Sequence, residues 1–144
     1  MGGLSAPKND TATSAAAAHL PLVAADFVDL LAWQEGVALV RDVVRTAPQV
    51  RGAGAEEVVD QMLRAAESVP ANVAEGYGRG LGPDFARFLR VAAASAAELE
   101  SHVRVAEASG RLGAEAALGL VARARRVRAL VVGLRRSVKR KSAD

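Results

Sequence analysis

The chain has 144 residues, which is the size of one ordinary domain. It is 51% hydrophobic but only 3% aromatic, and it has no cysteine, so disulfides, thiol catalysis and thiolate metal sites are excluded. No apolar run reaches the roughly 20 residues that span a bilayer, and the start of the chain lacks the apolar core of a secretory signal. We therefore expect a cytoplasmic protein.

The net charge of +3 hides a strong asymmetry along the chain. Residues 1–110 contain 9 Lys/Arg and 14 Asp/Glu, a net charge of −5, whereas residues 111–144 contain 10 Lys/Arg and 2 Asp/Glu, a net charge of +8. A basic C-terminal quarter on a mildly acidic body indicates a polyanionic partner at one surface.

The first half of the chain predicts a tail and two helices. Residues 1–22 are small and polar without apolar periodicity, which predicts a disordered tail. Apolar residues at spacings of three and four predict a helix from about Ala24 to Thr46 and a second helix from Ala55. Pro70 should kink the second helix, and we expect it to end in a flexible glycine-rich loop over residues 76–82.

The second half predicts two longer helices joined by a short turn. Pro83 suits the first position of a third helix, and Gly110 ends it. The last helix runs from about Ala114 to Lys139, with a heptad seam of Ala117, Leu120, Ala124, Val127, Val131, Leu134 and Val138. Together these elements predict an all-α, antiparallel up-down four-helix bundle over residues 23–141.

Polar residues recur along one side of the second predicted helix at helical spacing. This stripe consists of Arg64, Ser68, Asn72, Glu75 and Arg79, and Arg87 or Arg90 of the third helix could pair with Asn72 and Glu75. We interpret the stripe, with Arg87, as a structural layer that fixes helix register. A ligand-binding or catalytic layer is the alternative.

Histidine and carboxylate spacing argues against a metal enzyme. Metal sites in four-helix bundles use Glu-x-x-His motifs, but this chain has only His19 and His102, and Glu98 precedes His102 by four residues. No nucleophile motif accompanies His102. We therefore expect no metal, no cofactor and no catalytic residue.

The last helix carries the strongest functional signal, a dense band of cations with almost no acids between them. We predict that this band holds nucleic-acid phosphates, mainly through arginine, whose planar fork suits bidentate phosphate contacts. Arg123 lies closer to the seam and could meet an acid on a neighbouring helix. The alternative is a protein-interaction scaffold, in which the cations meet acidic faces such as Glu56, Glu57 and Asp60 of an adjacent subunit. The predicted binding residues are Arg125, Arg126, Arg128, Arg135, Arg136, Lys139, Arg140 and Lys141.

Three segments in order carry a family resemblance that covers residues 27–110. In chain order they run from Phe27 to Gln34, from Gln61 to Arg79, and from Asp84 to Glu100. The segment from Gln61 to Arg79 resembles the signature of four-helix-bundle proteins encoded in intervening sequences of large-subunit ribosomal RNA genes. That family is similar to the accessory variability determinant proteins of diversity-generating retroelements. The resemblance implies a homo-oligomer, with a pentamer expected, that binds nucleic acid and has a reverse transcriptase as a possible partner.

Overall fold

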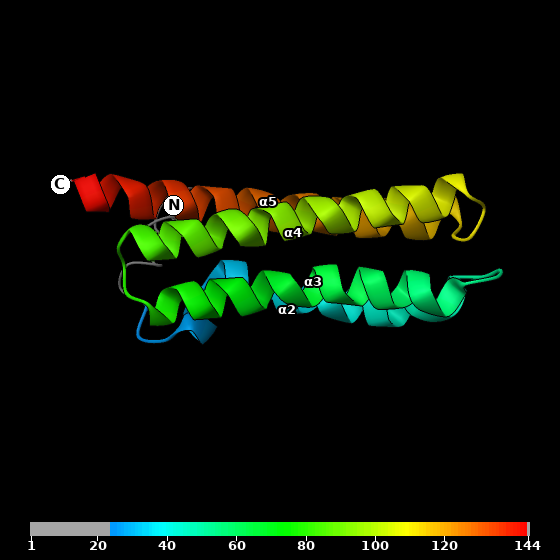
Figure 1. The fold of residues 1–144 in the computed structure, drawn as a ribbon, viewed down its shortest axis with the longest axis horizontal. Coiled ribbons are helices and arrows are strands. Elements are labelled where there is room, and N and C mark those ends of the chain that lie inside the picture. Colours follow the sequence, from blue (N-terminus) through cyan, green and yellow to red (C-terminus); the bar gives the residue numbers. More distant parts are fainter. Residues whose placement is uncertain (1–23, 144) are drawn as a thin grey trace, which may run out of the picture.

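The computed structural model describes residues 24–143, so the tail expected at residues 1–22 lies outside the described part. Four long helices follow one another antiparallel: α2 (Leu31–Thr46), α3 (Ala55–Gly78), α4 (Pro83–Ala108) and α5 (Ala114–Ala143) (Figure 1). Two short 3-10 turns, η2 (Phe27–Asp29) and η3 (Ala47–Gln49), flank α2. Residues 24–143 contain no strand, and the predicted all-α four-helix bundle is confirmed.

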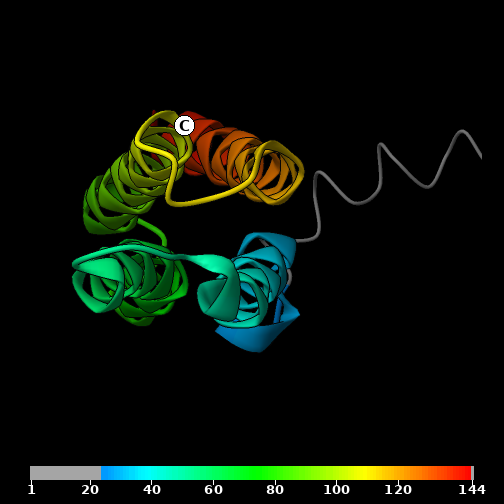
Figure 2. The ribbon, with the colours of Figure 1, turned by 90° about the vertical axis from the view of Figure 1, so that its right-hand side faces the viewer.

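The four helices form a closed square when the bundle is viewed from its end (Figure 2). α2 packs against α3 and α5, and α4 packs against the same two helices, so α2 and α4 are diagonal to each other. The antiparallel order places the start of α4 and the end of α5 at the same end of the bundle (Figure 1). None of the helices described is both long enough and apolar enough to cross a bilayer.

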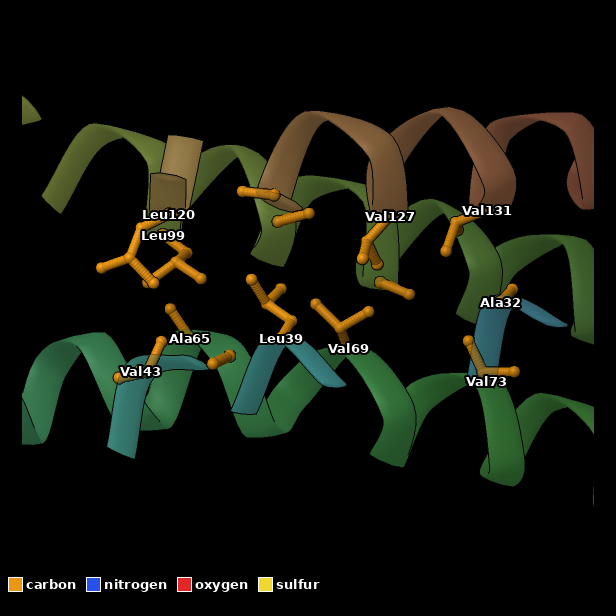
Figure 3. Packing of buried hydrophobic residues seen from close by; sticks show 14 of the residues in the cluster. Ala32, Leu39, Val43, Ala65, Val69, Val73, Leu99, Leu120, Val127 and Val131 are labelled. Atoms are coloured by element: carbon orange, nitrogen blue, oxygen red, sulfur yellow. The ribbon is translucent and has the colours of Figure 1, made fainter. Parts of the chain in front are cut away.

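Small aliphatic side chains fill the core between the helices (Figure 3). Leu39 and Val43 of α2 and Val69 of α3 face Leu99 of α4 and Val127 of α5, and all five are fully buried. Burying one such side chain contributes about 1.5–3 kcal/mol. All seven residues of the predicted heptad seam are buried, namely Ala117, Leu120, Ala124, Val127, Val131, Leu134 and Val138.

The first helix begins later than the prediction of Ala24. Asp26 accepts a hydrogen bond from the backbone N–H of Phe27 at 2.6 Å, which caps the short η2 turn instead of a long helix. Leu30 then takes an extended conformation with φ −74° and ψ 125°, so α2 starts at Leu31. The apolar periodicity continues through this break, and for that reason the sequence pattern did not show it.

The second helix continues into the loop expected at residues 76–82. Gly76 belongs to α3, which ends at Gly78. Gly76 is buried, and a Cβ atom there would lie 2.7 Å from Cβ of Phe88 and 2.9 Å from Cδ2 of Phe85. Gly76 therefore allows α4 to approach α3 closely. Pro70 also lies inside α3, which extends from Ala55 to Gly78, and its ring packs against the buried Gly36 of α2.

Candidate nucleic-acid interface

The last helix, α5, presents its apolar seam to the core and its cations to the outside. It continues to Ala143, four residues beyond the predicted end at Lys139, so Arg140 and Lys141 are also helical. Of the eight predicted binding residues, seven are exposed and Arg135 is partly buried. Their surroundings nevertheless divide α5 into two halves. We call residues 114–126 the paired half and residues 127–143 the unpaired half.

Arg123 connects the paired half to α2 through two ion pairs. Its Nη1 lies 2.7 Å from Oε2 of Glu35, and its Nε lies 2.9 Å from Oδ2 of Asp42. The two carboxylates are seven residues apart, which places both on the face of α2 that looks toward α5. The expectation that Arg123 meets acids on a neighbouring helix is confirmed.

Arg125 and Arg126, two of the predicted binding residues, also have carboxylate partners. Nε of Arg125 lies 3.0 Å from Oε1 of Glu100 on α4, whose other oxygen lies 2.9 Å from Nε of Arg104. Nε of Arg126 lies 3.5 Å from Oε2 of Glu35. The lack of acids within α5 therefore did not leave these arginines unpaired, because the partners come from the neighbouring helices.

The arginines lower the pKa of the two shared carboxyl groups. Burial alone would raise the pKa of Glu35, but hydrogen bonds and charges from Arg123 and Arg126 outweigh this effect and hold the pKa below its ordinary value. Hydrogen bonds from Arg125 and Arg104 lower the pKa of Glu100 in the same way. The pKa of Arg123 is raised, first by its hydrogen bond to Asp42 and then by that to Glu35. These pairs belong to the packing of the bundle.

The unpaired half differs because none of its cations lies within 4.0 Å of a carboxylate in residues 24–143. The six cations are Arg128, Arg135, Arg136, Lys139, Arg140 and Lys141. Arg140 makes one hydrogen bond, from Nη2 to Oγ of Ser137 at 3.5 Å. Six like charges on four turns of helix repel one another and create a positive potential at this end of the bundle. The arrangement therefore favours a polyanion.

The predicted polar stripe is divided into two clusters. In the first, Asn72 donates from Nδ2 to the backbone O of Ser68 at 2.7 Å and to Oγ of Ser68 at 3.0 Å. The Ser68 hydroxyl in turn lies 2.8 Å from the hydroxyl of Ser95 on α4. Ser95, only 7% exposed, is a member of this cluster that the predicted stripe did not include. The cluster joins α3 to α4 and is consistent with a role in helix register.

The second cluster lies at the exposed end of α3, where the expected pairing is wrong. Glu75 pairs with Arg79 within α3, from Oε1 to Nη2 at 2.8 Å, and neither Asn72 nor Glu75 pairs with Arg87 or Arg90. Residues four apart are neighbours on a helix surface, so Glu75 and Arg79 can pair within α3. The guanidinium groups of Arg79 and Arg87 lie 5.3 Å and 4.7 Å from the ring centroid of Phe88. Arg64, the remaining stripe member, is exposed.

Other polar side chains of the bundle form local pairs. Nε2 of His102 lies 3.3 Å from Oε1 of Glu98, one turn earlier on α4. Within residues 24–143, no three or more His, Asp or Glu side chains gather in a way that could hold a metal ion.

Comparison with known families gives one match that covers most of the chain. The profile of the family described as "23S rRNA-intervening sequence protein" matches residues 28–133. This range includes the three resembling segments except Phe27, all of α2 to α4, and α5 as far as Gly133. A comparison with curated proteins found no match.

Proposed function

Because the chain belongs to the 23S rRNA-intervening sequence protein family, we propose that it is a non-enzymatic, oligomeric protein that binds the phosphate backbone of RNA or DNA. The observation that carries this proposal is the unpaired half of α5, where six cations have no carboxylate partner within residues 24–143. The paired half shows that this fold can neutralise arginines from neighbouring helices. Among residues 24–143, no neighbouring helix does so at the end of α5.

Arginine density and the scarcity of aromatic residues define the kind of binding. Arginine donates to phosphate oxygens in a bidentate manner, and such contacts release counterions and depend strongly on salt. Base stacking on single strands needs exposed aromatic side chains, and only 3% of the chain is aromatic. We therefore propose backbone contacts with little sequence preference.

The direct test measures binding of labelled RNA and DNA by the full chain at several salt concentrations. We expect the triple variant R128Q/R136Q/R140Q to lose at least about tenfold in affinity and to show a salt slope that is shallower by about two to three. The matched control is R41Q/R45Q/R64Q, which removes the same charge from exposed arginines that have no carboxylate partner in residues 24–143. Equal losses in both variants would contradict a localised site.

A protein-interaction scaffold is the second candidate, favoured by an exposed acidic surface at the start of α3. Glu56, Glu57 and Asp60 are all exposed and lack a basic partner within the described residues. They could receive the unpaired half of α5 from an adjacent subunit. Light scattering of R128Q/R136Q/R140Q distinguishes the two candidates, because loss of assembly supports the scaffold and an intact oligomer opposes it.

The finer expectations from the retroelement resemblance are part of the same proposal. A homopentamer would have five times the chain mass of 14.9 kDa. It would repeat the unpaired half of α5 five times, which increases avidity for a long polyanion. Sedimentation equilibrium tests the assembly, and the presence of a reverse transcriptase gene beside this one tests the proposed partner.

A further inference from the structure

A cationic hollow lies between the first turns of α4 and the last turns of α5, at the end of the bundle where these helices meet. Its volume is about 440 Å³, and its walls include Arg87 and Arg90 of α4 and Arg135, Lys139 and Ser142 of α5. Spacings of three residues on α4 and four residues on α5 place each pair of cations on one helix face. The hollow therefore receives two cations from each side.

Among residues 24–143, no acid lines this hollow. Within the described residues, one carboxylate comes within 4.0 Å of a cation of the hollow: Oδ1 of Asp84 lies 3.9 Å from Nε of Arg87 on the same helix. Arg90, Arg135 and Lys139 have no carboxylate within 4.0 Å among residues 24–143. Three or four cations gathered without counter-charge repel one another, so the arrangement is most stable when an anion lies between them.

Arg135 provides an independent observation. Its Nε is inaccessible to solvent and has no hydrogen-bond partner among the described residues. A buried donor without a partner is costly, and nearly all such groups in folded proteins are satisfied by protein, water or ligand. The nearby Ser142 is not a partner of Nε either: the Ser142 hydroxyl lies 3.0 Å from the backbone O of Val138 and 3.4 Å from that of Leu81, and its proton can be donated to one of them.

From this geometry we infer that the hollow is a phosphate-binding site in which Arg90, Arg135 and Lys139 hold one phosphate group from both helices. A backbone phosphodiester offers two free oxygens and one negative charge, and a free phosphate offers more of both, so either can accept from two guanidinium groups and an ammonium. The inference rests in part on the proposed function, because it makes the hollow the place where the unpaired half of α5 holds a nucleic-acid backbone together with α4. The same chemistry would also accept free phosphate.

The side-chain N–H signal of Arg135 Nε allows a direct test by NMR in the full-length protein. The signal is assigned with R135Q and followed while inorganic phosphate replaces chloride at constant ionic strength. We expect a saturable shift in the wild type and in the control R41Q, and at least a fivefold weaker phosphate affinity in R90Q. R41Q is matched because it removes one exposed arginine from α2, the helix diagonal to α4. Absence of a saturable shift, or an equal affinity in R90Q, would overturn the site.

A second titration, with a short oligonucleotide, separates this inference from the proposed function. We expect the oligonucleotide to shift the same signal at lower concentration and to be displaced by inorganic phosphate. If the oligonucleotide binds but the Arg135 signal does not respond, the hollow is not the site and the proposed function stands. If inorganic phosphate gives the shift and no oligonucleotide binds, the phosphate site stands and the proposed function fails.

A stronger response to a poly-glutamate peptide of equal charge would overturn the phosphate assignment in favour of an acidic protein partner. Circular dichroism melting of R90Q confirms that the variant is folded.

Discussion

The two halves of α5 both carry arginines on their outer side, but they meet different neighbours. In the paired half, Arg123, Arg125 and Arg126 reach Glu35, Asp42 and Glu100 on the helices beside them. In the unpaired half, the cations continue at similar density, and the nearby face of α4 presents Arg87 and Arg90 instead of acids. A basic helix alone therefore does not define a binding surface. The charges opposite it decide whether its arginines stabilise the bundle or remain available to a ligand.

The largest effect on stability is expected from Arg123. The variant R123Q removes two ion pairs and leaves Glu35 and Asp42, both mostly buried, with fewer partners. We expect the free energy of unfolding to fall by about 1–2 kcal/mol. The matched variant R136Q, in the unpaired half, should change it by less than about 0.5 kcal/mol. Urea denaturation measures both, and equal losses would remove the distinction between the two halves.

Acidification should weaken the bundle through the paired half. The pKa values of Glu35 and Glu100 are lowered in the folded state, so these groups stabilise the fold above the ordinary carboxyl value of 4.5. That contribution decreases as the pH falls below this value and is lost once the pH passes the lower folded pKa. Urea denaturation from pH 6 to pH 3 should show the decline. It should be shallower in E35Q/E100Q, and an identical pH dependence in that variant would contradict the assignment.

A smaller effect is expected when an acid of the paired half is neutralised. E100Q releases Arg125 and Arg104 from their shared carboxylate, so the paired half gains free cations. We expect nucleic-acid affinity to rise by about two- to fivefold, the size of one screened ionic contact. The control E107Q removes a carboxylate that has no ion pair in the described residues, and it should raise affinity less. Binding titrations at fixed salt measure the difference.

Much of the fold could be predicted because it depends on local patterns. All seven residues of the predicted heptad seam of α5 are buried in the core. The position of Arg123 close to that seam predicted its contact with acids on a neighbouring helix. The break at Leu30 could not be predicted, since apolar periodicity continues through it. The role of Gly76 also required the structure, because its small size matters only where Phe85 and Phe88 approach it.

The candidate site was less predictable, because it depends on which helices are neighbours. The sequence shows that α5 has few acids of its own, but not that Glu100 of α4 and Glu35 of α2 lie beside Arg125 and Arg126. It also does not show that Arg90 of α4 shares a hollow with Arg135 of α5, since 45 positions separate them in the chain. Helical spacing fixes which residues share a face, whereas the order of helices in the bundle fixes which faces meet.

The most direct measurement compares two triple variants of the same helix, R123Q/R125Q/R126Q and R128Q/R136Q/R140Q, in both nucleic-acid binding and urea denaturation. Each removes three charges from α5. We predict that the first loses stability and keeps its affinity and salt slope within about twofold of the wild type, whereas the second keeps its stability and loses at least about tenfold in affinity. Equal losses of affinity in the two variants, or a greater loss in the first, would contradict the assignment of binding to the unpaired half.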